Sequence, residues 1–107
     1  MEFNVLDQYV SDYFRKRRED FKYSTRYVAG RLGLAKSTYY YYEMNYRSIP
    51  LDIVKKLLNL YNEDGNELIE GLTDTFNREM IRTYAYLHGY NKVKSIDKDN
   101  NVVDEDL

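Results

Sequence analysis

The side chains best suited to binding chemistry lie between residues 24 and 50, in the run STRYVAGRLGLAKSTYYYYEMNYRSIP. Its Lys, Arg, Ser and Thr side chains donate hydrogen bonds, and its tyrosine rings add apolar surface. The chain has no Cys, and its single His argues against a histidine-based metal site or catalytic triad. No pair of carboxylates and no Ser is placed for catalysis, so we expect neither enzymatic activity nor a cofactor.

Two short helices joined by a tight turn are predicted within this run. Ser24 is a good N-cap for a helix of about eight residues, and Gly33 permits the positive φ that ends it. The next helix is expected over about 36–44, where Asn45 tolerates the left-handed conformation that stops a helix. Pro50 then precedes another helix. This is the layout of a DNA-reading helix-turn-helix, whose second helix lies in the major groove.

The remainder of the chain is predicted to be helical as far as about residue 88. Apolar residues recur with helical spacing over 4–18, a short helical turn is expected over 67–70 and ends at Gly71, and a further helix is expected over 73–88. We expect an all-α fold in three parts. They are a helix-turn-helix domain (1–70), a C-terminal helix that is a candidate dimerisation element (71–90), and a flexible acidic tail (91–107).

Charge is distributed unevenly along a chain whose net charge is only −2. Residues 15–56 hold eleven Lys or Arg against four Asp or Glu, whereas residues 57–107 hold five against eleven. A basic middle between acidic ends indicates a phosphate-facing surface, and the alternative is a set of solvated helix faces. No apolar run approaches membrane length, and no signal-peptide pattern opens the chain, so we expect a soluble cytoplasmic protein without membrane contact.

A spaced set of residues runs from the second expected helix to the fourth. It comprises Ala29, Gly33, Leu34, Ser37-Thr38, Tyr42-Glu43 and Arg47-Ser48-Ile49-Pro50. This pattern resembles the Cro/C1-type (XRE-like) helix-turn-helix family of bacterial and phage regulators, over residues 6 to 70 or so. The resemblance implies a five-helix, lambda-repressor-like DNA-binding bundle, beyond which we expect an additional C-terminal helix and a polar tail. It also implies a structural ion pair between Arg18 and Glu43.

The sequence shows four departures from the family pattern. Thr25 stands where the family usually has Gln, and Ala35 occupies the N-cap position of the third helix although Ala cannot cap. Met44-Asn45 replaces the usual Asn-Gly. Tyr39 occupies the place of a β-branched aliphatic residue, so either the core there is roomy or the hydroxyl reaches the rim.

The resemblance and the helical spacing together assign roles to individual side chains. Lys36, Ser37, Tyr40 and Tyr41 are expected to contact DNA bases, with Lys36 at guanine and the tyrosine rings against thymine methyl groups. Phosphate contacts are expected from Thr25, Tyr46 and Arg47. The alternative is that these side chains are solvated, or that the tyrosines bind a protein, since Tyr is enriched at protein interfaces.

Two further surfaces have open interpretations. Arg15, Lys16 and Arg17 either add long-range attraction for DNA or form a solvated helix end. The stripe over 73–88 is either a dimer face or packs back onto the core. Its members are Phe76, Met80, Ile81, Tyr84 and Leu87.

Double-stranded DNA is the leading expected partner. We expect a sequence-specific regulator, a repressor from a phage or mobile element, that binds a palindromic operator as a homodimer through its third helix. The alternative is a protein-binding adaptor on the same fold, such as an antirepressor, an antitoxin-like partner or an inhibitor of a host nuclease. The acidic C-terminal half and the Tyr-rich helix support that alternative, in which a protein partner replaces DNA.

Overall fold

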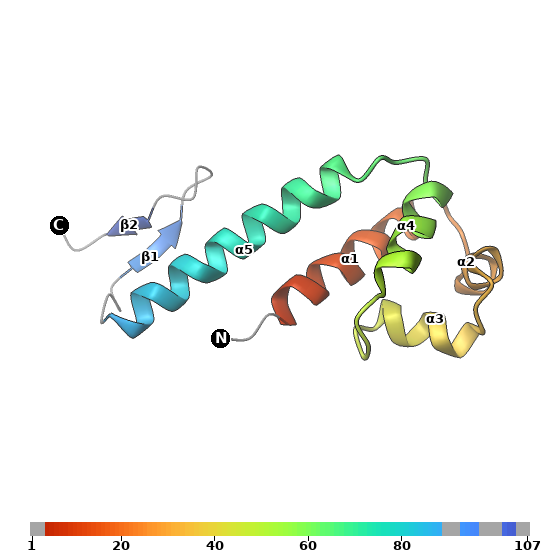
Figure 1. Ribbon diagram of the computed structural model, residues 1–107, viewed down its shortest axis with the longest axis horizontal. Helices are drawn as coiled ribbons and strands as arrows, with labels where there is room; N and C mark the ends of the chain where they lie inside the picture. Colours follow the sequence, from red (N-terminus) through yellow and green to blue (C-terminus); the bar gives the residue numbers. More distant parts are fainter. Residues whose placement is uncertain (1–3, 89–92, 97–101, 105–107) are drawn as a thin grey trace.

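Five helices follow one another along the chain in the computed structural model, which describes residues 4–88 and the backbone of 93–96 and 102–104 (Figure 1). Their bounds are α1 (Asn4–Asp20), α2 (Thr25–Leu32), α3 (Lys36–Glu43), α4 (Leu51–Leu60) and α5 (Asn66–Leu87). The predicted helical bundle is therefore confirmed. Helix α1 packs against both α3 and α5, and α2 packs against α3 and α4, so α1 connects the two ends of the domain.

The turn between α2 and α3 forms as its residues predict. The Ser24 hydroxyl accepts a hydrogen bond from the Tyr27 amide and caps α2. Gly33 adopts φ +70°, and the Leu34 amide donates to the Ala29 carbonyl, which closes the end of the helix. Helix α3 begins at Lys36 without a side-chain cap, as expected for Ala at position 35.

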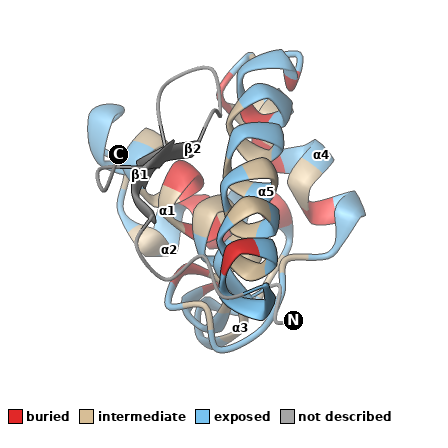
Figure 2. Cartoon of the chain, turned by 90° about the vertical axis from the view of Figure 1, so that its left-hand side faces the viewer, coloured by how far each residue is buried: buried red, intermediate tan, exposed pale blue. Residues whose placement is uncertain are grey.

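The core lies where the first four helices and the start of α5 meet. Its most completely buried large side chains are Phe14, Val28 and Leu57. Aromatic rings fill much of the remaining space, with Tyr61 stacked on Phe14 at 6.4 Å between ring centroids. Most residues of α5 are exposed or half-buried, because only its first turns pack on this core (Figure 2).

Helix α5 differs from the expected pair of helices. The sequence predicts a short turn that ends at Gly71 and a separate helix after it, but α5 runs without a break from Asn66 to Leu87. The additional C-terminal helix is therefore the distal part of α5. Gly71 serves a different purpose: a Cβ built there would lie 1.7 Å from the Tyr9 hydroxyl of α1. The glycine lets α1 and α5 approach each other, and this close packing overrides its helix-ending tendency.

The expected acidic tail, 91–107, lies mostly outside the described residues. Its described part consists of two short antiparallel strands, β1 (Val93–Ile96) and β2 (Val102–Asp104), with Ile96 paired with Val102. Among the helices that the structure describes, none combines the length and apolarity needed to cross a bilayer.

Candidate nucleic-acid interface

Helix α3 divides its side chains between two faces. Tyr39 and Glu43, four residues apart, are buried against the bundle. Lys36, Ser37, Tyr40 and Tyr41 are all exposed, and their spacing places them on the opposite side of the helix. The four expected base-contacting residues thus share one accessible surface.

Helix α1 holds α3 in place from behind. The Ser11 hydroxyl, itself buried, donates a 2.9 Å hydrogen bond to the Tyr42 carbonyl. Arg18 forms an ion pair with Glu43, with Nη2 2.6 Å and Nε 2.8 Å from Oε1, and its Nη1 donates to the Tyr23 carbonyl at 2.9 Å. Because the Glu43 side chain is only 5% exposed, Arg18 rather than water compensates its carboxylate. The pair therefore fixes the position of the exposed face of α3.

Buried phenols surround this ion pair. Burial raises the pKa of Tyr39, the charge of Glu43 raises it further, and Arg18 opposes the shift. Burial likewise raises the pKa of Tyr61, whose hydroxyl has no hydrogen-bond partner among the described residues. Burial alone would lower the pKa of Arg18, but its hydrogen bond with Glu43 and the charge of that carboxylate raise it. Tyr39 is thus accommodated inside the core, since it is only 2% exposed and its side chain does not reach the rim.

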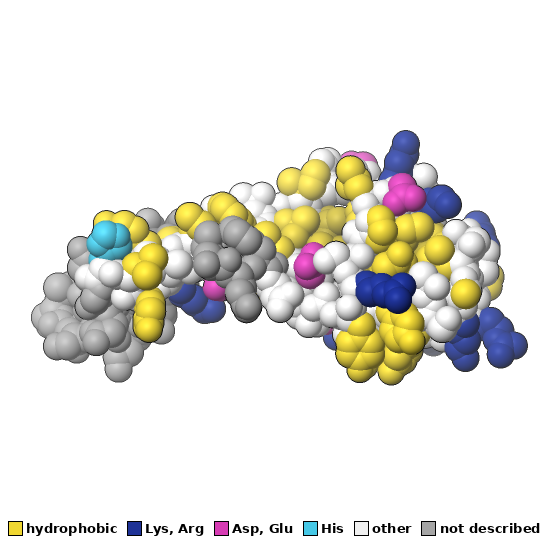
Figure 3. Space-filling view, turned by 60° about the horizontal axis from the view of Figure 1, so that its bottom comes forward, with side chains coloured by type: hydrophobic (Ala, Val, Ile, Leu, Met, Phe, Trp, Pro, Cys, Tyr) yellow, Lys and Arg dark blue, Asp and Glu magenta, His cyan; other side chains and the backbone are white. Residues whose placement is uncertain are grey.

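Three tyrosines at the end of α3 form one exposed group, which we call the tyrosine cluster: Tyr40, Tyr41 and Tyr46. Their ring centroids lie 6.1–6.2 Å apart in every pairing. The Arg47 guanidinium lies over the Tyr41 ring, 5.0 Å from its centroid. The surface beneath α3 accordingly shows hydrophobic side chains gathered beside a basic one (Figure 3).

The loop after α3 is fastened to α1 at two points. Asn45, in the expected left-handed conformation at φ 59°, donates from its side chain to Gln8 at 3.1 Å. The Ser48 hydroxyl donates to Asp7 at 2.8 Å. Tyr46 and Arg47 lie between these anchors and are exposed. Both expected phosphate-contacting residues of this loop are therefore held at the surface.

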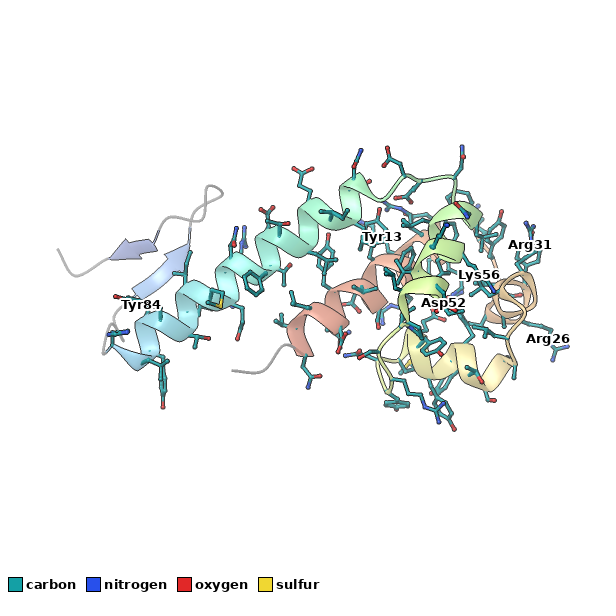
Figure 4. The ribbon with its side chains drawn as sticks, in the orientation of Figure 1. Tyr13, Arg26, Arg31, Asp52, Lys56 and Tyr84 are labelled. Atoms are coloured by element: carbon teal, nitrogen blue, oxygen red, sulfur yellow. The ribbon has the colours of Figure 1, made fainter. Side chains whose placement is uncertain are left out.

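Helix α2 supplies basic residues that the sequence-based assignment missed. Thr25, at its first turn, is half-buried, whereas Arg26 and Arg31 are exposed and extend away from the bundle (Figure 4). Arg31 Nη1 donates to the Tyr27 hydroxyl at 2.8 Å. The four-residue spacing of Tyr27 and Arg31 was the available signal for this pairing. These two exposed cations on α2 add to the basic residues of the helix-turn-helix.

Two of the three cations considered for long-range attraction of DNA, Arg15 and Arg17, are engaged with carboxylates. Arg15 pairs with Asp12 at 2.8 Å. Arg17 pairs with Glu63 at 2.5 Å and with Glu67 at 2.8 Å. Arg17, whose side chain is 18% exposed, is therefore neither a solvated helix end nor free to attract DNA.

The candidate dimer face lies on the distal half of α5, away from the tyrosine cluster (Figures 1 and 4). Four of its five residues are exposed, and Ile81 is half-buried. The Tyr84 ring stacks on His88, 4.1 Å between centroids. None of the five residues belongs to the core cluster, which is formed by the first four helices and the start of α5. No group of three or more potential metal ligands occurs among the described residues.

The tight turn at Gly33, the buried support behind α3 and its exposed outer face define a helix-turn-helix protein. A family model described as helix-turn-helix matches residues 8–68, more than half of the chain. The chain belongs to this Cro/C1-type helix-turn-helix family of DNA-binding regulators. Comparison with curated proteins gave no match, and comparison with solved structures gave none either.

Proposed function

We propose that this protein is a sequence-specific transcriptional repressor of a phage or other mobile element, acting in the cytoplasm without enzymatic activity or cofactor. It binds a palindromic operator as a homodimer and inserts α3 into the major groove. The observation that carries this proposal is the exposed face of α3, where Lys36, Ser37, Tyr40 and Tyr41 lie together on a rigidly supported helix. Such a face matches the helix that reads base edges in this class of fold.

Phosphate contacts from flanking elements would orient this helix. Arg47 and Tyr46 lie after α3, and Thr25 and Arg26 lie at the start of α2. Basic groups on both sides of a reading helix suit the two DNA backbones that border a major groove. These residues would supply affinity and register, while the face of α3 would supply sequence preference.

The decisive test is selection of genomic fragments with purified protein, followed by binding to the selected fragment at two salt concentrations. We expect a short inverted repeat, bound far more tightly than random DNA. Arg47→Ala should weaken binding to all sequences alike and reduce the salt slope by about one. Tyr41→Ala should instead relax base preference. Lys16→Ala, an exposed change on α1, is the matched control for loss of positive charge.

Dimerisation through the distal half of α5 is tested separately. Met80→Glu should convert a dimer to a monomer in analytical ultracentrifugation and weaken operator binding, because a charge would replace apolar contact surface. Tyr86→Glu is the control, since Tyr86 is 81% exposed and lies outside the proposed face. A monomer at all concentrations in the unmodified protein would contradict the dimeric mode.

The exposed tyrosine cluster favours a second candidate function, a protein-binding adaptor. Three neighbouring aromatic rings are typical of a protein interface. Absence of any enriched DNA, or weak binding that vanishes at physiological salt, would favour this candidate. Tight binding of a protein, abolished by Tyr40→Ala with Tyr41→Ala and unaffected by DNA, would establish it.

A further inference from the structure

We propose that the tyrosine cluster recognises the C5-methyl group of thymine, and of 5-methylcytosine, in the major groove. This inference rests on the proposed function and specifies which chemical feature of the operator the face of α3 reads. It concerns the cluster as one surface, because each of its rings contacts the other two.

The backbone after α3 makes this surface possible. The amides of Tyr46 and Arg47 both donate to the Tyr41 carbonyl, at 2.9 and 3.3 Å. These hydrogen bonds fold the loop back over the end of the helix, so the Tyr46 ring lies against the rings of Tyr40 and Tyr41. Tyr46 therefore belongs to the same surface as the helical tyrosines, although it lies outside the helix. Its ring would contribute to the methyl contact, and its hydroxyl is the group that would contact phosphate.

The three tyrosines differ in how much of each side chain is exposed. Tyr41 is 38% exposed and carries the Arg47 guanidinium over its ring. Tyr40 and Tyr46 are 46% and 65% exposed. The cluster thus presents apolar ring surface from Tyr40 and Tyr46, supported by Tyr41, with a cation at its side. The rings suit contact with an apolar group on a base, and the cation suits a neighbouring phosphate.

The chemistry of the groove selects the ligand. Tyrosine lacks the paired donors and acceptors with which Arg, Asn and Gln bind guanine or adenine at two points. Thymine offers the C5-methyl group for apolar contact in the major groove, and 5-methylcytosine carries the same group at the same position. Contact with an aromatic surface removes that methyl from water, which favours methylated pyrimidines over their unmethylated forms.

The test replaces thymine by deoxyuridine at single positions of the selected operator, which removes one methyl and leaves the hydrogen-bonding groups unchanged. At one or two positions in each half-site we expect affinity to fall about three- to fivefold, the factor that follows from burying one methyl group. In a second pair of operators, the same position carries either cytosine or 5-methylcytosine. The operator with 5-methylcytosine should be bound more tightly, by a similar factor.

Variants assign the effect to the cluster. In Tyr40→Ala and Tyr41→Ala the ratio of thymine to uracil affinity should approach one, whereas Tyr41→Phe keeps the ring and should keep the ratio. Tyr86→Ala, an exposed tyrosine on α5, is the control. Because each ratio is measured within one variant, a general loss of affinity does not change it.

Three results would overturn the inference. If uracil at every position leaves affinity unchanged while the operator is still bound specifically, the methyl is not read, although the proposed function stands. If uracil weakens binding equally in the unmodified protein and in the alanine variants, another part of the protein contacts the methyl. If no duplex is bound specifically, the proposed function fails and this inference fails with it.

Discussion

Arg17 and Arg18 are neighbours at the end of α1, yet they stabilise different regions of the molecule. Arg18 points toward the helix-turn-helix, where it pairs with Glu43 at the end of α3. Arg17 pairs with Glu63, in the loop before α5, and with Glu67 in the first turn of α5. Its guanidinium also lies over the Tyr13 ring of α1, 4.4 Å from the ring centroid. Since successive helical residues differ by about 100° in direction, one short segment holds both regions.

The carboxylate partners of the two arginines differ in how far they are exposed to water. The Glu43 side chain is nearly inaccessible, whereas Glu63 is 19% and Glu67 is 71% exposed. A carboxylate left without its partner costs more free energy where water cannot replace that partner. The buried Glu43 carboxylate therefore depends on Arg18, whereas Glu63 and Glu67 are also reached by water.

The largest effect is expected from Arg18→Ala. It leaves the buried Glu43 carboxylate unpaired, so the free energy of unfolding should fall by about 3–5 kcal/mol. Urea denaturation followed by circular dichroism measures this change. Arg15→Ala is the control at the same end of α1, because both partners of its ion pair are substantially exposed. A loss no greater than that of the control would show that Glu43 does not need Arg18.

Arg17→Ala should have a smaller effect, about 1–2 kcal/mol in urea denaturation, because water and Tyr13 still solvate Glu63. The hydrogen bond with Glu63 raises the pKa of Arg17, so the guanidinium is charged at every relevant pH. Under conditions where the variant is folded, its DNA affinity should equal that of the unmodified protein. Equal losses of stability for Arg18→Ala and Arg17→Ala would show that burial of the carboxylate does not determine the cost of removing its partner.

Gly71→Ala tests the close approach of α1 and α5. The added Cβ collides with the Tyr9 hydroxyl, and the ring must move, so we expect a loss of about 1 kcal/mol despite the better helix propensity of Ala. In a Tyr9→Ala background the same change should stabilise the protein by about 0.5–1 kcal/mol. Thermal unfolding of all four proteins gives this double-mutant cycle. A stabilising effect in both backgrounds would contradict the packing role.

Tyr13→Phe should have the smallest effect at neutral pH and a clear one in alkali. Burial raises the pKa of Tyr13 to about 12, and its hydrogen bond with Glu63 contributes. A phenol whose pKa is higher when folded stabilises the fold below its unfolded pKa of about 10. That contribution is lost as pH rises toward 12. Tyr13→Phe should therefore lose less stability than the unmodified protein between pH 10 and 12. Identical pH profiles would exclude this role.

The helix-turn-helix itself was predictable because its signals are local. Ser24 caps α2, Gly33 ends it, and Asn45 adopts the left-handed conformation, each for reasons that involve only neighbouring residues. The exposed face of α3 follows from helical spacing alone. The Arg18–Glu43 pair was reached through the family resemblance, because no local pattern connects two residues that lie in different helices.

The α1–α5 region was harder to predict because its determinants are distant in sequence. From the sequence alone, Gly71 is interpreted as the end of a helix. Its actual role depends on the Tyr9 side chain of α1, which lies close to it only in the fold. The role of Arg17 could not be decided from local spacing, because its partner Glu63 is 46 residues away. The tyrosine cluster was missed for a related reason: Tyr46 lies outside α3 and reaches Tyr40 only because the loop turns back.

The register of α1 has a consequence for how such sequences can diverge. Ser11 and Arg18 are seven residues apart, close to two helical turns, and they hold the consecutive residues Tyr42 and Glu43. One residue inserted between them would rotate Arg18 by about 100° and direct it away from Glu43. We therefore expect an insertion or deletion between these two anchors to disrupt the support of α3, whereas substitutions elsewhere in α1 keep the spacing. The length of this segment is thus expected to be constrained more strictly than its composition.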